Sequence, residues 1–395
     1  MKKSALRKSV LSDSKLTKIR YVINGLIAMI IYYIIPVKKR KGEYWLIGGH
    51  LGEMYDDNSK AFFEYIINNK KNQEIYWVLN KGSIADQNNK YRRNVIYRGS
   101  INAFLYCFRC RCIIVSHSFA DVMPIFYKLK DLFNIKSIYL FHGIYGLKKV
   151  ATLKDNYYSC FDIINSVGNF EKDIKIEYMN IKEEQIKIMG LPRYDKLYNT
   201  RISNGNIMVM FTWRTYTEEE EGRNKYFNNI KSFLTNEKLL EYLRKNEIKI
   251  NVVLHSFAHK YFSFIKEIES ENVIIMPKNI DIQSELIKNS LLITDYSSVA
   301  WDFMYMNKPV IFYHFDLEEY MKERGSYIDL KNDLFGEVAY KEDTLVLLII
   351  KYIKSKFNIN NDINEKIKNY FKYTDNKNCE RIYEEVIELL DKSKV

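Results

Sequence analysis

The sequence predicts an α/β fold with two halves, each a parallel sheet flanked by helices. Short apolar runs alternate with amphipathic segments from Glu43 onward, and the alternation starts again after a polar break at residues 198–206 (YNTRISNGN). The chain has 395 residues, too many for one core but enough for two domains of typical size. With 47% hydrophobic and 28% charged residues, its composition excludes intrinsically disordered and fibrous proteins.

The apolar runs have the length of buried strands, and they are separated by stretches long enough for a crossover helix. The strands are predicted at 44–48, 74–79, 94–97, 112–116, 137–141 and 162–166 in the first half, and at 207–211, 249–254, 272–275, 291–294 and 309–313 in the second. Helices are predicted over 59–69 and 101–109, and a helical stretch over 364–391. The expected layout is an N-terminal segment (1–42), a first domain (43–197), a linker (198–206), a second domain (207–375) and a C-terminal helix that packs back (376–395).

The N-terminal segment carries most of the excess positive charge. Sixty-one Lys and Arg against 49 Asp and Glu give the chain a net charge of +12, and eleven of these basic residues lie between Lys2 and Lys41. They bracket residues 21–37, seventeen residues without a charge, whose helix would be about 25 Å long against a hydrocarbon core of ~30 Å. We expect this helix to lie in the interface of an anionic membrane; a buried core helix and a single span are the alternatives.

The five cysteines, an odd number without regular spacing, favour a reducing compartment. Cys107, Cys110 and Cys112 have a spacing that could suggest zinc, but no second CxxC follows and no fourth ligand is apparent. Buried thiols beside a strand are the better interpretation, and we predict no metal site.

A histidine directly follows the predicted strand at 137–141. His142 enters a turn that contains Gly143 and Gly146 and is followed by Lys148. Ligands of parallel sheets bind beyond the carboxyl ends of the strands, and a histidine with a pKa near ~6.5 can accept a proton from a hydroxyl group. His142 is therefore a candidate general base, and a packing or capping histidine is the alternative.

In the second half, the strand at 291–294 leads through Thr294 and Asp295 to Ser297 and Ser298, where a helix is predicted to begin. Free backbone N–H groups and the helix dipole at that point favour an anion, and the two hydroxyl groups add donors. Asp302 lies one turn further along the same face, where its carboxylate suits a sugar or glycerol hydroxyl. An ordinary serine N-cap is the alternative.

Other strand ends supply residues suited to a nucleotide diphosphate. Thr212, Trp213 and Arg214 follow the first strand of the second half, His255 closes the next one, and Arg193 closes the first half. The sequence contains no P-loop, no GxGxxG after the first strand and no Asp-x-Asp. These absences disfavour P-loop kinases and dinucleotide oxidoreductases, and they favour a metal-independent mechanism without a cofactor.

Taken in order, these motifs resemble the CDP-glycerol glycerophosphotransferase family, which builds teichoic acids and related surface or capsular polymers. The resemblance runs from about Gly48 to Tyr327 and rests on Gly52-x-x-Tyr55-x-Asp57-Asn58-x-Lys60, His142-Gly143 with Leu147-Lys148, Gly190-Leu191-Pro192-Arg193-x-Asp195, Thr212-Trp213-Arg214, His255, Thr294-Asp295-Tyr296-Ser297-Ser298 with Asp302, Lys308-Pro309 and Arg324-Gly325-x-Tyr327.

The resemblance implies a GT-B fold with two facing Rossmann-like domains and a cleft between them, the first domain binding the acceptor and the second the CDP-alditol. It implies catalytic roles for His142 as base and His255 at the pyrophosphate. The donor-binding residues expected are Gly143, Lys148, Arg193, Thr212, Trp213, Arg214, Thr294, Asp295, Ser297, Ser298 and Asp302.

The activity expected is transfer of glycerol phosphate from CDP-glycerol to a hydroxyl of a lipid-linked or polymer acceptor, with release of CMP. CDP-ribitol and a nucleotide sugar remain alternative donors, because the glycerol and ribitol branches share these motifs. The partners expected are this donor, a polyprenol-linked or polymer acceptor and an anionic membrane at the cytoplasmic face of the cell membrane. A basic nucleic-acid-binding module is disfavoured, because the aromatic residues are not interleaved with Arg and Lys on one face.

Overall fold

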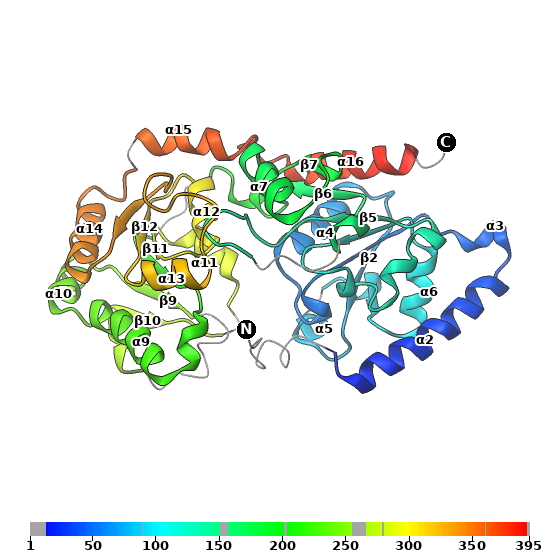
Figure 1. Ribbon diagram of the computed structural model, residues 1–395, viewed down its shortest axis with the longest axis horizontal. Helices are drawn as coiled ribbons and strands as arrows, with labels where there is room; N and C mark the ends of the chain where they lie inside the picture. Colours follow the sequence, from blue (N-terminus) through cyan, green and yellow to red (C-terminus); the bar gives the residue numbers. More distant parts are fainter. Residues whose placement is uncertain are drawn as a thin grey trace. The chain divides into compact units, whose positions relative to one another are not determined.

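The computed structural model describes residues 13–88, 90–150, 157–200, 204–254, 266–278, 280–359 and 361–392. The chain divides into two compact units (Figure 1). The first contains Met1–His142, Leu153–Asp195 and Asp375–Val395, and the second contains Gly143–Thr152 and Lys196–Thr374. Both are α/β units, which confirms the predicted fold class.

The first unit is built on a seven-stranded sheet in the order β3-β2-β1-β4-β5-β6-β7, with every pairing parallel. Buried apolar runs such as WLIG in β1 and CIIV in β4 form its centre, as expected for strands covered on both faces. The strands are β1 (Trp45–Gly48), β2 (Ile75–Leu79), β3 (Val95–Tyr97), β4 (Cys112–Val115), β5 (Lys136–Tyr139), β6 (Ile163–Ser166) and β7 (Ile186–Ile188).

Helices cover this sheet and contribute to its core. They are α2 (Lys15–Ile34), α3 (Val37–Arg40), α4 (Asp57–Asn69), α5 (Ile84–Asn88), α6 (Ile101–Arg109), α7 (Asn169–Met179) and α16 (Asn378–Lys392), with α8 (Tyr194–Leu197) where the chain passes into the second unit. The C-terminal helix α16 places Cys379, Ile382, Val386 and Leu390 in the same buried cluster as Trp45 of β1.

The second unit has a six-stranded parallel sheet in the order β10-β9-β8-β11-β12-β13. Its strands are β8 (Ile207–Met210), β9 (Ile250–Val253), β10 (Val273–Ile275), β11 (Leu291–Thr294), β12 (Val310–Tyr313) and β13 (Glu337–Ala339). Its helices are α9 (Glu220–Leu234), α10 (Glu237–Lys245), α11 (Ile282–Lys288), α12 (Val299–Tyr305), α13 (Leu317–Glu323), α14 (Glu342–Lys354) and α15 (Asn361–Tyr370).

Both sheets reverse their strand order at one place, between β1 and β4 in the first unit and between β8 and β11 in the second. This is the doubly wound order of Rossmann-like folds, in which ligands bind beyond the carboxyl ends of the strands at the reversal. Each unit therefore has one edge at which its functional residues are expected.

Three details differ from the sequence-based expectations. The sheets contain two further three-residue edge strands, β7 and β13, that the sequence did not reveal. The helical stretch expected over 364–391 is two helices, α15 and α16, interrupted between Tyr370 and Asn378. The segment Gly143–Thr152, placed by sequence in the first domain, belongs to the second unit.

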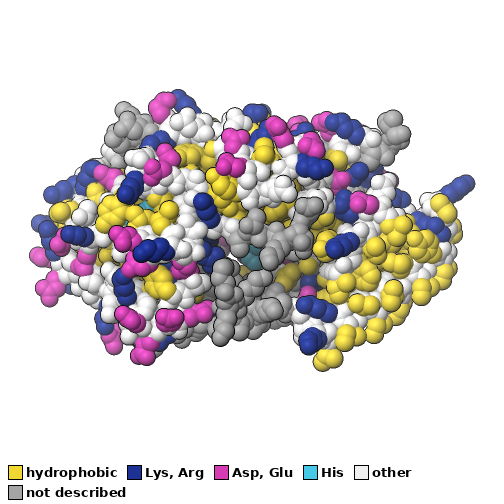
Figure 2. Space-filling view, in the orientation of Figure 1, with side chains coloured by type: hydrophobic (Ala, Val, Ile, Leu, Met, Phe, Trp, Pro, Cys, Tyr) yellow, Lys and Arg dark blue, Asp and Glu magenta, His cyan; other side chains and the backbone are white. Residues whose placement is uncertain are grey.

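The N-terminal apolar segment forms α2, which is long and apolar enough to cross a membrane by length and composition. Tyr21, Gly25 and Ala28 are its buried residues, and the helix packs on α6 of the first unit. A side chain at position 25 would collide with the ring of Phe126. The opposite face is exposed and forms the hydrophobic band over α2 in Figure 2.

The cysteines are free thiols, and four of the five are buried. Burial raises the pKa of Cys107, Cys110 and Cys112, so these thiols are neutral. In the part of the chain that the structure describes, no group of three or more His, Cys, Asp or Glu side chains could hold a metal ion.

Candidate active site

Three histidines meet at the carboxyl edge of the first sheet. His50, His117 and His142 follow β1, β4 and β5, which are neighbours in the sheet. The rings of His50 and His117 have centroids 3.6 Å apart, and those of His117 and His142 are stacked at 4.8 Å with an angle of 11°. Strand order, not sequence order, therefore brings the three imidazoles together at the reversal point.

The backbone in this edge is held in an uncommon conformation. His50, Leu51, Asp57 and Phe141 all have positive φ, from 47° to 60°. Such residues cost about 1–3 kcal/mol each and persist where their surroundings hold them. At Phe141, the carbonyl oxygen accepts a hydrogen bond from the buried side chain of Asn58 (2.8 Å), which holds the peptide directly before His142.

Buried Asp121 joins the two loops that carry His50 and His117. Its carboxylate accepts hydrogen bonds from the backbone N–H groups of Leu51 (2.9 Å), His117 (3.3 Å) and Ser118 (2.8 Å). Charge-assisted bonds of this kind are stronger than neutral ones. The spacing of the first two imidazoles is thus set by a carboxylate in the short helix after β4.

Two further carboxylates face the histidines. Asp56 lies 3.3 Å from Nε2 of His50, and Asp57 lies 4.0 Å from Nε2 of His117. Asp57 also forms an ion pair with Arg193 at 2.9 Å. The surroundings of the imidazoles are therefore acidic on this side.

Arg193, expected from sequence to bind donor phosphate, braces the loop of His142 instead. Its side chain donates to Asp57 (2.9 Å) and to the carbonyl oxygen of His142 (3.1 Å), and its backbone N–H donates to Asn58 (3.2 Å). Arg193 is buried. These contacts tie Arg193 to Asp57, Asn58 and the loop of His142 within the first unit.

The side chains of His117 and His142 have different environments. Burial, followed by the neighbouring His50, His142 and Arg193, holds the pKa of His117 well below its usual value, so that this ring is neutral at neutral pH. His142, in contrast, is exposed. An exposed imidazole that follows a strand end, and whose backbone is fixed by hydrogen bonds, is a suitable acceptor for a substrate proton.

The loop after His142 is fixed within the second unit. Gly143 lies so close to Ser298 that a Cβ atom would be 3.0 Å from its Oγ, and Gly146 lies against the ring of Trp301. The carbonyl oxygen of Gly146 accepts hydrogen bonds from the side chain of Ser326 (2.9 Å) and the backbone of Tyr327 (2.9 Å). Lys148 follows on the same loop and is half-buried.

At the end of β11, the two serines behave differently from an ordinary helix cap. Ser298 precedes α12 but its side chain makes no capping hydrogen bond, and both Ser297 and Ser298 are half-buried. Thr294 is buried, and its hydroxyl donates to the carbonyl oxygen of Met210. Asp302 is buried in the first turn of α12. Ser297 and Ser298 thus remain the candidates for direct ligand contact, and Thr294 supports the strand.

Arg214 and Asp295, both expected to contact the donor, form a buried network instead. The Arg214 guanidinium lies 2.7 Å from Asp316 and 2.8 Å from Asp295, and it donates to the carbonyl oxygen of Thr212 (2.6 Å). Only 1% of the side chain is exposed. The two carboxylates raise the pKa of Arg214 despite its burial, so that the guanidinium stays charged and its charge is compensated within the unit.

Aromatic rings complete this network. Tyr296 and Tyr320 are stacked with centroids 3.4 Å apart, and His314 stacks on the other side of Tyr296 at 4.4 Å. The Arg214 guanidinium lies 4.8 Å from the ring centre of Tyr296. The strand ends of the second unit are therefore a rigid platform.

Thr212 and Trp213 lie beside this platform. The backbone N–H of Thr212 donates to both oxygens of Asp295 (2.9 and 3.0 Å), whereas its buried hydroxyl has no hydrogen-bond partner among the residues that the structure describes. Trp213 is half-buried and packs against the core of the unit. The Thr212 hydroxyl is thus a group that a ligand could satisfy.

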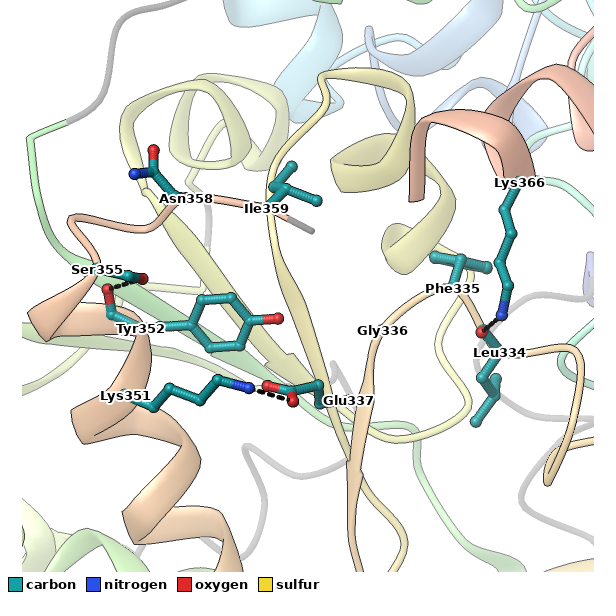
Figure 3. Close-up of a pocket in the computed structure, with 10 residues that line it drawn as sticks. All are labelled: Leu334, Phe335, Gly336, Glu337, Lys351, Tyr352, Ser355, Asn358, Ile359 and Lys366. Atoms are coloured by element: carbon teal, nitrogen blue, oxygen red, sulfur yellow. Dashed lines mark hydrogen bonds and ion pairs between the residues drawn. The ribbon is translucent and has the colours of Figure 1, made fainter. Parts of the chain in front are cut away.

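Two further points concern the predicted site. His255 lies outside the described residues. A cavity of about 450 Å³ in the second unit, lined by Glu337, Lys351, Tyr352 and Lys366 among others, begins at the amino end of β13 (Figure 3). It contains none of the predicted site residues, and it lies at the end of the strand opposite to the motifs.

The family model of CDP-glycerol:poly(glycerophosphate) glycerophosphotransferases matches residues 36–388, which include both sheets and all the motifs above. The chain belongs to this family. The sequence-based assignment to the family is therefore confirmed.

Curated relatives in this family act in teichoic acid synthesis. Over 94% of its length the chain is 28% identical to the minor teichoic acid biosynthesis protein GgaB of Bacillus subtilis, of which it spans only 42%. It is 25% identical to the teichoic acid glycerol-phosphate transferase of Staphylococcus aureus over 75% of its own length and 80% of that protein. The teichoic acid ribitol-phosphate polymerase TarL of Staphylococcus aureus is 23% identical over 81% of the chain and 58% of that protein.

Among solved structures, the wall teichoic acid polymerase TagF has the same fold. One TagF structure superposes with a TM-score of 0.71 at 16% identity, covering 96% of this chain and 98% of that one. Another, solved with CDPG, has a TM-score of 0.69 at 17% identity, covering 96% and 99%. This likeness confirms the GT-B-like fold class.

The strand-end histidines His50 and His117, and Asp316, were missed by the sequence analysis. His50 and His117 each lie within two residues of a predicted strand end, which was the signal available for them. Asp316 lies in the polar loop after β12 and has no local signal for its contact with Arg214.

Proposed function

We propose that this protein transfers glycerol phosphate from CDP-glycerol to a hydroxyl of a teichoic acid or related polymer acceptor and releases CMP. The observation that carries the proposal is His142, an exposed imidazole on a braced backbone, whose next residue Gly143 packs against Ser298 of the motif expected to hold the donor. Membership of the glycerophosphotransferase family supports the same reaction.

In this proposal, His142 takes the proton of the acceptor hydroxyl. The acceptor oxygen forms a bond to the β-phosphorus of CDP-glycerol, the bond from that phosphorus to the bridging oxygen breaks, and its electron pair leaves with CMP. The charge that develops on CMP is stabilised by Ser297, Ser298 and the start of α12, with Lys148 adding positive charge. His255 has the additional role at the pyrophosphate that the family resemblance implies.

The buried network of the second unit holds this donor platform in place. Arg214 and Asp295 act by positioning Thr212 and the loop after β11, because their charges are compensated inside the protein. We propose that the Thr212 hydroxyl and the Asp302 carboxylate meet the alditol. No cofactor or metal ion takes part in this scheme, and activity that persists in excess EDTA is the expected result.

The donor is tested with a panel of CDP-glycerol, CDP-ribitol and nucleotide sugars, presented with a glycerol-phosphate polymer acceptor. CMP released only with acceptor, and fastest from CDP-glycerol, is the expected result. Faster CMP release from CDP-ribitol than from CDP-glycerol would show that the transferred group is ribitol phosphate. Release of a nucleoside diphosphate from a nucleotide sugar would show a glycosyltransferase instead.

We further propose that the enzyme is held at the cytoplasmic face of the membrane by α2. One face of this helix is docked on α6, and the other exposes large apolar side chains beside the basic residues of α3. Such a face suits the headgroup and acyl boundary of an anionic bilayer. The exposed apolar residues of α2 are Leu16, Ile19, Val22, Ile23, Leu26, Ile27, Ile30, Tyr33 and Ile34, and Val37 at the start of α3 is also exposed.

A double variant tests this part of the proposal. Leu26→Glu with Ile30→Glu places charges on the exposed face of α2, and we expect it to lose binding to vesicles that contain phosphatidylglycerol. Leu347→Glu is the matched control, since Leu347 is exposed to a similar degree on α14. Equal vesicle binding of the double variant and the wild type would contradict the role of α2.

A further inference from the structure

The gap between His117 and Asp57 in the first unit is a site without an assigned role. Nε2 of His117 and a carboxylate oxygen of Asp57 are 4.0 Å apart, too far for a hydrogen bond. An oxygen atom about 2.8 Å from both would close the gap with ordinary hydrogen-bond lengths. Both side chains are partly exposed, at 19% and 17%, so that a ligand can reach them.

The orientation of His117 is well determined. Its Nδ1 is hydrogen-bonded to Ser116 Oγ at 2.9 Å, and Ser116 is in turn bonded to buried Ser59. Its backbone carbonyl oxygen accepts a hydrogen bond from Tyr139 (2.8 Å). With Nδ1 occupied in this way, Nε2 is the ring atom that faces Asp57.

Asp57 is held equally firmly. The carboxylate oxygen of Asp57 that does not face the gap is paired with Arg193. Asp57 is the first residue of α4, and its backbone has a φ of 58°. The same residue therefore presents one oxygen to Arg193 and the other to the gap. The His50 ring contacts the His117 ring, with centroids 3.6 Å apart, and is itself paired with Asp56.

The chemistry of the gap selects a neutral hydroxyl group. A carboxylate accepts hydrogen bonds only, whereas an imidazole nitrogen either accepts or donates according to its tautomer. A hydroxyl oxygen both donates and accepts, so it fits in either case. The oxygens of a fully ionised phosphate only accept hydrogen bonds, so they cannot satisfy the Asp57 oxygen at the gap.

The gap lies directly beside the proposed base. The rings of His117 and His142 are stacked with centroids 4.8 Å apart, so a ligand that presents one hydroxyl to His142 can present an adjacent hydroxyl to the gap. Vicinal hydroxyl groups occur at the end of a glycerol or ribitol chain.

We propose that His117 and Asp57 bind the non-reacting hydroxyl of a vicinal diol at the acceptor terminus and so place its neighbour at His142. This inference rests on the proposed function for the role of His142, and it assigns recognition of the acceptor's non-reacting hydroxyl to His117 and Asp57. His117 is then a specificity-determining residue.

The test compares two synthetic acceptors, one ending in glycerol phosphate with both hydroxyls free and one lacking only the non-reacting hydroxyl. The wild type is expected to favour the diol by about tenfold to hundredfold in kcat/KM, the usual worth of a hydrogen bond to a charged or buried group. His117→Asn keeps an amide at the Nδ1 position for Ser116 and removes the Nε2 position, and it should lose this preference.

Two variants separate the hydrogen bond from packing. His117→Gln restores a polar atom near the Nε2 position, and we expect it to recover part of the preference. His117→Phe keeps a ring between His50 and His142, and we expect it to behave as His117→Asn does. A wild-type preference for the diol that is retained in both His117→Asn and His117→Phe would overturn the proposal, as would a wild type without preference.

Binding of the two acceptors to the full-length protein is measured in parallel, without donor. If no CDP-alditol gives turnover, the proposed function fails, but tighter binding of the diol that disappears in His117→Asn would still support the site. Equal binding of both acceptors to the wild type would overturn the site itself.

Discussion

The two units share one strand order but differ in the chemistry at their strand ends. The first unit gathers three imidazoles, with Asp56 and Asp57 beside them, and its His142 is exposed. The second unit buries Arg214 between Asp295 and Asp316 under stacked tyrosines. The shared topology sets where functional residues lie, and the degree of burial decides what they do: partly exposed groups can exchange protons, and compensated buried charges make a rigid support.

The largest effect expected from this difference is at His142. His142→Ala should lower kcat by roughly 10²–10⁴-fold, the usual contribution of a general base. Binding of CDP-glycerol, which we place on the second unit, should change little. Turnover is measured as CMP release and donor binding by calorimetry. A variant with full activity, or one that loses donor binding to the same extent as turnover, would place the proton acceptor elsewhere.

In the second unit, the corresponding experiment affects stability before activity. Asp316→Asn removes a charge from the buried Arg214 network, in which the guanidinium donates to both Asp316 oxygens at 2.7 and 3.1 Å. Losing a buried hydrogen bond to a charged group costs about 1.5–3 kcal/mol, while Asp295 at 2.8 Å still compensates the charge of Arg214. The free energy of unfolding in urea should fall by that amount.

The matched control for this loss is an ion pair at the surface of the same unit. Lys368 and Glu365 are both exposed and lie 3.1 Å apart on α15. Glu365→Gln should change the free energy of unfolding by less than about 1 kcal/mol. Equal losses in the two variants would mean that the buried network does not stabilise the platform.

The apolar strands at the centre of both sheets were predictable from the sequence, because β1 (WLIG) and the first three residues of β11 (LLIT) are apolar, and both strands are buried along their whole length. The edge strand β13 was not, since it is half-buried and contains Glu337. His142 and Ser298 stand out in the sequence because each follows a strong strand. The contact of Arg214 with Asp316 could not be predicted, because the two residues are 102 positions apart and only the fold brings them together. The contact between the His50 and His117 rings likewise depends on the order of strands.

A smaller effect is the pH dependence of the free energy of unfolding, to which a buried histidine of the second unit contributes. His314 is 1% exposed in the second unit, and burial lowers its pKa to about 4, although the Asp295 carbonyl and carboxylate and Asp316 oppose the shift. The unfolded chain, with a histidine pKa near 6.5, binds its proton first as the pH falls. Stability from this group is complete above pH 6.5 and falls toward pH 4 by up to about 1.4 kcal/mol per pH unit.

His314→Phe removes this titration and keeps a ring beside Tyr296, with which His314 stacks. We expect a flatter dependence of the free energy of unfolding on pH between 6.5 and 4. The remaining slope should include the share of His117 in the first unit, whose pKa is also lowered. If His314→Phe leaves the slope of the free energy of unfolding against pH unchanged, protonation of His314 does not destabilise the second unit in acid.

The smallest effect compares one glycine in each unit. Gly190 and Gly205 both have left-handed backbone, with φ of 79° and 77°. Alanine at either position costs about 1–2 kcal/mol for that conformation. At Gly190, a Cβ atom would also lie 1.8 Å from the Oδ1 of Asn378, whereas at Gly205 no atom of the described part of the chain would lie within 4 Å of it. Asn378 cannot move freely, because it is buried at the start of α16 and bonded to Asp195 (2.7 Å) and Arg381 (2.8 Å).

Gly190→Ala should therefore lose a further 1–3 kcal/mol, roughly the cost of overpacking a well-filled site, compared with Gly205→Ala. Urea unfolding of the two variants measures the difference, with the shared backbone strain cancelling between them. Because Gly190 closes the loop that leads to Arg193, and Arg193 braces His142, the same variant should also lower kcat, while Gly205→Ala should not. If the two variants lose the same free energy of unfolding and have the same kcat, the docking of α16 does not hold the strand-end loop in place. The position of His142 would then be set by the strand ends alone.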